Sequence, residues 1–114
     1  MDQIRSWLYI GKYRDTLDKE ILESASINAM LQLAEHVEQK GIVSLYLPVE
    51  DLAPLRMEHI ETGVKFIKEN HHNNRRILIA CGAGINRSTV FCLIALKELE
   101  GLNLIDAYKD IKQC

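Results

Sequence analysis

The stretch that decides the fold reads Arg76-Ile77-Leu78-Ile79-Ala80-Cys81-Gly82-Ala83-Gly84-Ile85-Asn86-Arg87-Ser88-Thr89-Val90-Phe91. Its apolar run at 77–80 has the length and character of a buried strand. A tight loop with two glycines follows at 81–86, and from Arg87 the pattern is helical until Gly101, a typical residue just past a helix end. A strand, a glycine loop and a helix start direct several backbone N–H groups at one spot, and such a spot attracts anions.

This loop is expected to bring a thiol and a guanidinium to the same anion. Cys81 and Arg87 are the two ends of the loop, and the residues between them are Gly82, Ala83, Gly84, Ile85 and Asn86. A phosphoryl group held there would accept N–H bonds from the loop and a bidentate contact from Arg87. The same positive field favours the thiolate of Cys81, which is the nucleophilic form. Ser88, at the helix start, is placed to bond the sulfur and to stabilise it as a leaving group.

Other interpretations of these residues explain less of the pattern. A free cysteine is most often a small buried hydrophobe, but such a residue needs neither a glycine-rich loop nor an arginine at a helix start. Arg87 alone could form a surface salt bridge, so its assignment depends on that of Cys81. A dinucleotide motif would need a third glycine where Arg87 stands, and a nucleotide P-loop would need a Gly-Lys-Ser/Thr ending.

Residues 80–88 resemble the signature loop of the cysteine-dependent protein tyrosine phosphatases, Cys-x5-Arg-Ser/Thr with a central glycine. The small dual-specificity branch is the most similar. Residues 7–11 resemble its entry strand, 27–33 its second strand, and 47–51 the strand end and loop that carry its general acid. The resemblance runs in order over about residues 4–112 and implies a phosphomonoester hydrolase. Such enzymes work through a cysteinyl-phosphate intermediate and need neither a metal nor another cofactor.

Asp51 is the residue that the resemblance assigns as general acid. Phosphoryl transfer to sulfur requires a proton on the departing oxygen, and a loop carboxylic acid can deliver it and then activate water. Asp51 follows a predicted strand and precedes a predicted helix, so a helix cap or a solvated loop charge is the alternative. Glu50 is the neighbouring rival for the same role.

Two departures from the family leave a second interpretation open. Ala80 stands where the family usually has the histidine that helps to hold the loop. The family also continues beyond the position of Cys114 with an Arg-Pro pair and a further helix, so this chain is expected to lack that last helix. Both differences fit a phosphate-binding module with little or no turnover, a pseudophosphatase.

A third interpretation is an RNA 5′-triphosphatase, because residues 84–87 also resemble the loop of that relative. The formal net charge of −2 argues against this reading and against nucleic-acid or membrane-surface binding in general. The expected partners are instead a phosphorylated protein or a small phosphomonoester, with phosphate or sulfate bound in the loop.

Length and composition fit a single globular domain over residues 1–114, expected to be a monomer. Hydrophobic residues make up 47% of the chain, and no apolar run approaches the about 20 residues of a membrane span. The opening residues show no basic-then-apolar signal. Three cysteines without a CxxC pair argue against a disulfide framework and favour a reducing, cytoplasmic location.

The remaining candidate groups are weaker. Cys92 or Cys114 could capture an oxidised Cys81, but sequence position does not establish that the sulfurs are close. The pair His71-His72 suggests a metal only superficially, because adjacent residues point in different directions and no ligand cluster accompanies them. Arg75-Arg76 is more typical of a solvated turn than of a substrate patch.

Alternating strand and helix patterns predict an α/β fold with a central, mostly parallel sheet flanked by helices. The predicted strands are residues 7–10, 27–33, 42–47 and 77–80. The predicted helices are residues 15–23, 34–40, 55–70, 88–100 and 104–111. The phosphate loop would then lie at the carboxyl end of a central strand, where ligands bind in such sheets.

Overall fold

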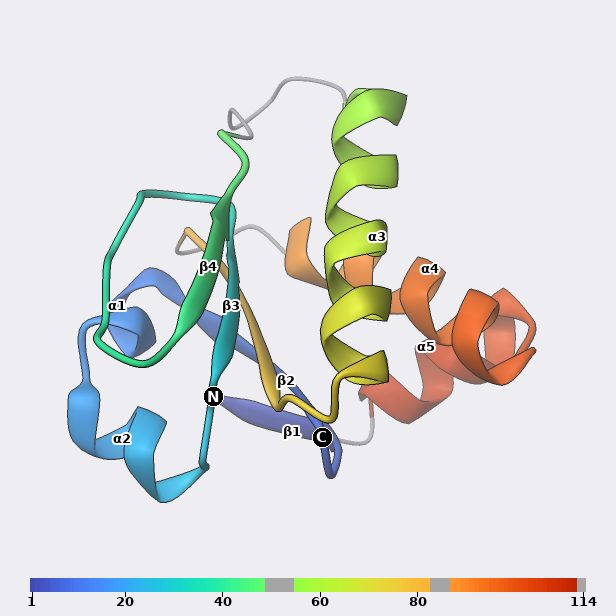
Figure 1. Cartoon of the computed structure of the whole chain (residues 1–114). Coiled ribbons are helices and arrows are strands. Elements are labelled where there is room, and N and C mark those ends of the chain that lie inside the picture. Colours follow the sequence, from blue (N-terminus) through green and yellow to red (C-terminus); the bar gives the residue numbers. More distant parts are fainter. Residues whose placement is uncertain (49–54, 83–86, 113–114) are drawn as a thin grey trace.

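A computed structural model of the chain describes residues 1–48, 55–82 and 87–112 (Figure 1). Its strands are β1 (Asp2–Arg5), β2 (Leu8–Lys12), β3 (Ala29–Gln32), β4 (Val43–Tyr46) and β5 (Ile77–Cys81). Its helices are α1 (Tyr13–Thr16), α2 (Lys19–Ser24), α3 (Met57–His72), α4 (Arg87–Glu100) and α5 (Leu104–Lys112). This α/β arrangement confirms the predicted fold class.

The sheet has the order β1-β2-β5-β3-β4, and its three inner pairings are parallel. β1 joins β2 in an antiparallel pair, which the sequence patterns did not predict. Every residue of β5 and β3 is buried, because helices cover both faces of the inner strands. β5 is therefore the central strand, and its carboxyl end is at Cys81.

Helices lie on both sides of this sheet, with α1 and α2 on one side and α3, α4 and α5 on the other (Figure 1). The larger hydrophobic cluster forms on the α3–α4 side and includes Leu31, Ile67, Ile79 and Phe91. A smaller cluster on the other side includes Leu22, Met30 and Leu78. Side chains pack against β5 on both faces of the sheet, and this packing fixes the position of its last residue, Cys81.

The prediction of a helix over residues 34–40 is wrong, because the structure has no helix there. Gln32 is 1% exposed, and its side-chain amide bonds the backbone of Val37 in both directions, at 2.6 Å to the carbonyl and 3.0 Å from the N–H. This amide clamp satisfies the backbone that a helix would otherwise have to pair. The predicted helix over residues 15–23 is also replaced by the two short helices α1 and α2.

Arg5 connects the first strand to the last two helices. Its Nη2 lies 2.9 Å from Glu100 on α4 and 2.7 Å from Asp110 on α5. The side-chain hydrogen bond with Glu100 is the main reason that the pKa of Arg5 is raised above its ordinary value. The two ion pairs of Arg5 tie α4 and α5 to the edge of the sheet that β1 forms.

Substitution of Gly63 by alanine is expected to destabilise the fold by about 1–2 kcal/mol. A Cβ at this position would lie 2.4 Å from Cε1 of Phe91, a fully buried side chain of α4. Alanine favours a helix over glycine by about 1 kcal/mol, so overpacking must exceed that gain. Urea unfolding measures the change, and Thr62→Ala at the adjacent exposed position is the control. A more stable Gly63→Ala variant would contradict the close approach of α3 and α4.

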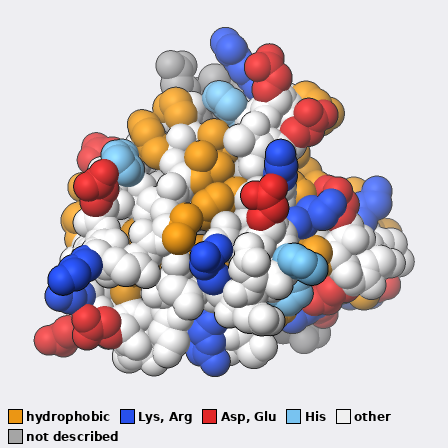
Figure 2. All heavy atoms as spheres, viewed as in Figure 1, with side chains coloured by type: hydrophobic (Ala, Val, Ile, Leu, Met, Phe, Trp, Pro, Cys, Tyr) orange, Lys and Arg blue, Asp and Glu red, His pale blue; other side chains and the backbone are white. Residues whose placement is uncertain are grey.

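Exposed hydrophobic side chains gather at one edge of the sheet. Figure 2 shows them over β4 and the neighbouring surface beside α3. Val43 and Tyr46 on β4 are 46% and 39% exposed, and Met57 at the start of α3 is 66% exposed. This surface follows the edge strand β4 and extends to the start of α3.

Candidate active site

Cys81 is the last residue of β5, and its side chain is 5% exposed. Its Sγ lies 3.3 Å from Oγ of Ser88, which is fully buried one residue inside α4. The sulfur also lies 4.0 Å from the carbonyl oxygen of Gly11. The chain thus leaves the central strand and enters α4 with a thiol and a hydroxyl in contact, as the sequence predicted for Cys81 and Ser88.

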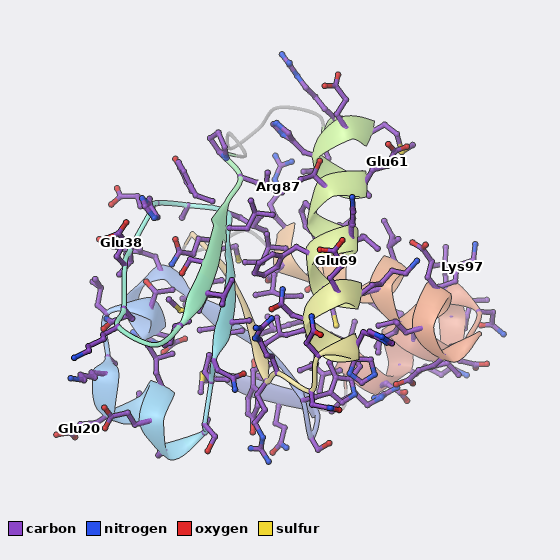
Figure 3. All side chains as sticks on the ribbon, viewed as in Figure 1. Glu20, Glu38, Glu61, Glu69, Arg87 and Lys97 are labelled. Carbon is purple, nitrogen blue, oxygen red and sulfur yellow. The ribbon has the colours of Figure 1, made fainter. Side chains whose placement is uncertain are left out.

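Arg87 is the first residue of α4 and is partly exposed. Figure 3 shows it at the end of the molecule where β3 and β4 finish and α3 begins. Because β2, β5, β3 and β4 run parallel, their carboxyl ends share this edge of the sheet. The guanidinium and the thiol therefore belong to the same edge, where an α/β fold binds its ligands.

Several predicted site positions lie outside the described residues. They are Ala83, Gly84, Ile85 and Asn86 of the phosphate loop, the predicted acid Asp51 and its rival Glu50. Of the loop, the structure describes Gly82, which is partly buried and follows β5 directly. Among the described residues, a Cβ on Gly82 would meet Ala34 alone, at 3.8 Å, which is an ordinary van der Waals contact.

A polar cavity of about 280 Å³ lies against the sulfur. Its described wall combines the end of β5, the start of α4, the corner between β2 and α1, and the N-terminus. The residues are Cys81, Gly82, Ser88, Ile10, Gly11, Lys12, Arg14, Asp15, Met1 and Asp2. The sequence analysis did not single out the residues of this corner. Register could have indicated them, because β2 pairs with β5 so that Gly11 lies beside Ala80 and Lys12 beside Cys81.

Ala80, the position at which the family usually has histidine, faces away from α4. It is 2% exposed and belongs to the smaller hydrophobic cluster, with Tyr9, Met30 and Leu78. Its carbonyl oxygen accepts the backbone N–H of Leu33 at 2.9 Å. The methyl group of Ala80 therefore packs in the smaller hydrophobic cluster and has no hydrogen-bonding group to offer.

The other groups that the sequence analysis considered either take part in packing or lie outside the described residues. His71 stacks on Trp7 with ring centroids 3.8 Å apart, and His72 is the last residue of α3, two residues beyond the predicted helix end. Within the described segments, no three His, Cys, Asp or Glu side chains gather as metal ligands would, and no helix has the length and apolar character to cross a membrane. Cys92 is fully buried in the larger cluster, and Cys114 lies outside the described residues.

Comparison with known proteins gives a consistent result. The family model described as "Dual specificity phosphatase, catalytic domain" matches residues 8–114. Dual specificity protein phosphatase 5 of Rattus norvegicus is 26% identical over 115 positions, which cover 97% of this chain and 30% of that protein. Dual specificity protein phosphatase 22 of Mus musculus is 25% identical over 98% of this chain and 62% of that protein. The chain thus spans less than two thirds of the length of these relatives.

Solved structures show the same fold. The crystal structure of DUSP15 superimposes with a TM-score of 0.89 at 25% identity, over 99% of this chain and 74% of that one. The human tyrosine phosphatase-like serine/threonine/tyrosine-interacting protein gives a TM-score of 0.87 at 20% identity, over 99% of this chain and 82% of that one. At that identity, the second likeness concerns the fold alone.

Proposed function

Because the chain belongs to the family of dual specificity phosphatase catalytic domains, we propose that it hydrolyses phosphomonoesters through a phosphorylated cysteine. The observation that carries this proposal is the contact of 3.3 Å between Sγ of Cys81 and Oγ of Ser88 at the junction of β5 and α4. A thiol beside a hydroxyl, at the start of a helix and against a polar cavity, suits a nucleophile that attacks an anionic ester.

In the first step, the thiolate of Cys81 attacks phosphorus. The S–P bond forms as the ester P–O bond breaks, and Asp51 gives its proton to the departing oxygen. Arg87 and the N–H groups of loop 82–86 hold the three equatorial oxygens, where charge must be stabilised in the transition state. These groups supply the positive charge that Mg²⁺ provides in other phosphoryl-transfer enzymes.

In the second step, water attacks the cysteinyl phosphate. Asp51, now a carboxylate, takes a proton from that water, the S–P bond breaks, and inorganic phosphate leaves. The Ser88 hydroxyl donates a hydrogen bond to the sulfur as negative charge returns to it, which makes Cys81 a better leaving group. The 3.3 Å contact places the two atoms at a suitable separation for a hydrogen bond that involves sulfur.

The substrates that we propose are phosphorylated proteins, as the names of the relatives suggest, with small aryl phosphates as artificial substrates. We also propose a monomer that works in the cytoplasm, since three cysteines without a CxxC pair suit a reducing compartment. Phosphate or sulfate is expected to bind in the loop as a product-like ligand. The net charge of −2 favours neither nucleic acid nor an anionic membrane as partner.

Hydrolysis of an aryl phosphate in the presence of EDTA tests the proposal. We expect turnover that EDTA does not reduce and that vanadate or tungstate, as phosphate-like oxyanions, inhibits. Absence of turnover in the folded protein, or turnover that appears only after a divalent metal is added, would contradict it.

Substitution of Asp51 by asparagine is expected to lower kcat by about 10²- to 10⁴-fold for phosphotyrosine peptides, because their leaving group needs the proton. The loss should be smaller for nitrophenyl phosphate, whose leaving group departs readily without a proton. Glu50→Gln is the matched control, since it removes the adjacent carboxylate. If Glu50→Gln causes the loss and Asp51→Asn does not, the acid is Glu50.

A binding module with negligible turnover is the second candidate. Ala80 favours it, because a methyl group packed among apolar side chains cannot supply the hydrogen bonds of the histidine that the family usually has there. Isothermal titration with a phosphopeptide, run beside a phosphate-release assay, separates the two functions. Tight binding without phosphate release over hours would favour the module.

A further inference from the structure

Asp15 is a buried carboxylate that the proposed reaction does not use. It is the third residue of α1, is 7% exposed, and forms part of the wall of the cavity beside Cys81. Its Oδ2 accepts the backbone N–H of Lys12 at 2.9 Å, and the amino group of Met1 lies 3.7 Å away. A buried carboxylate is costly unless it is bonded, so these contacts fix where it lies.

The Asp15 carboxylate is packed against the backbone that touches the nucleophile. A Cβ on Gly11 would lie only 2.6 Å from Oδ2 of Asp15, so any larger residue at position 11 would push against the Asp15 carboxylate. The carbonyl oxygen of this same Gly11 lies 4.0 Å from Sγ of Cys81. The Gly11–Lys12 corner is therefore held at its Lys12 N–H by the Asp15 carboxylate and is contacted at its Gly11 carbonyl by the sulfur of Cys81.

The need to begin a helix does not explain this arrangement. Asp18 caps α2, since its carboxylate accepts the N–H of Ile21 three residues ahead at 3.1 Å, and it does so from an exposed position. Asp15 lies in the first turn of a helix of only four residues, bonds back to Lys12, and is buried in the cavity wall with Cys81 and Ser88. The two aspartates can therefore be compared: each carboxylate accepts a backbone N–H three residues away, Asp18 from the residue ahead and Asp15 from the residue behind, in different surroundings.

We propose that Asp15 is a positioning residue for the nucleophile: by accepting the Lys12 N–H it fixes the Gly11–Lys12 corner against Cys81. The effect on turnover rests on the proposed function, whereas the effect on the sulfur's surroundings does not. A nucleophile displaced by about 1 Å loses up to about 10²-fold in rate, so a loosened corner has a measurable kinetic effect.

The test compares Asp15→Ala, Asp15→Asn and Asp18→Ala in the full chain. We expect Asp15→Ala to slow the burst of nitrophenol release, which reports phosphoryl transfer to Cys81, by about 10- to 100-fold per folded molecule, with KM nearly unchanged. Asp15→Asn should stay close to the wild type, because the amide oxygen still accepts the Lys12 N–H. Asp18→Ala should lose stability, measured as a lower urea midpoint, without any change in the burst.

A second readout separates failure of this inference from failure of the proposed function. Labelling of Cys81 by iodoacetamide, followed by mass spectrometry, needs no turnover. Asp15→Ala should label several-fold faster than wild type and Asp18→Ala, since an open corner exposes a sulfur that is now 5% exposed. If Asp15→Ala behaves like Asp18→Ala in labelling, the inference is wrong, whether or not the protein has phosphatase activity.

Asp15→Asn keeps the inference testable if Asp15→Ala does not fold. A folded Asp15→Asn with wild-type burst and labelling supports positioning by the hydrogen bond. A folded Asp15→Asn that loses tenfold or more in the burst, or labels as an open site would, overturns it, because the hydrogen bond alone would then not be sufficient.

Discussion

Cys81→Ser should reduce metal-free hydrolysis of an aryl phosphate by at least about 10⁴-fold, the scale seen when an enzyme loses its nucleophile. A serine hydroxyl at this position is nearly isosteric, and it can still contact Oγ of Ser88. It is a far weaker nucleophile than a thiolate at neutral pH. The variant should therefore fold and bind phosphate esters while its turnover falls to background, measured as phosphate release per folded molecule.

Cys92→Ser is the matched control for this substitution. Cys92 is also fully buried in the larger cluster but lies on α4, among core side chains. A buried hydroxyl there is expected to cost about 1–3 kcal/mol of stability, whereas turnover per folded molecule should be retained. Equal loss of activity in both variants would mean that packing, and not nucleophilic attack, explains the effect at Cys81.

Arg87→Lys is expected to lower kcat/KM by about 10²- to 10³-fold, the scale for loss of a charge-stabilising donor. Lysine keeps the positive charge at the start of α4 but cannot form two parallel hydrogen bonds to a phosphoryl group. The affinity for vanadate, which resembles the transition state, should fall together with the rate. Steady-state kinetics and vanadate inhibition measure both effects.

Arg14→Lys supplies the comparison for Arg87. Arg14 is exposed and also forms part of the cavity wall beside Cys81, so the substitution makes the same chemical change in the same cavity. It should leave vanadate affinity and kcat nearly unchanged. A loss at position 14 as large as that at position 87 would assign the clamp to the corner between β2 and α1.

The stretch around Cys81 could be predicted because local chemistry determines it. An apolar run followed by a glycine loop and a helical pattern forms the same units in any parallel sheet, and here they form β5 and α4. The contact between Cys81 and Ser88 follows from that geometry. The roles of Arg87 and Asp51 remain predictions, since they depend on how loops close around a ligand.

Other features depend on contacts between distant residues. The amide clamp from Gln32 to Val37 overrides the helical pattern of residues 34–40, and the local sequence pattern does not predict this clamp. The short polar strand β1 forms only because β2 offers an open edge. Asp15 lies in the cavity wall because of the register between β2 and β5, which periodicity alone does not specify.

Rapid acid quench during hydrolysis of a phosphopeptide, followed by mass spectrometry of proteolytic fragments, tests the central claim most directly. The account predicts one added phosphoryl group on Cys81, in the peptide that spans β5 and the start of α4, and none on Cys92. With nitrophenyl phosphate in place of the peptide, the adduct should accumulate further in Asp51→Asn, because that leaving group departs without a proton while activation of water is slow. Turnover without any phosphorylated Cys81, or with the phosphoryl group on another residue, would contradict it.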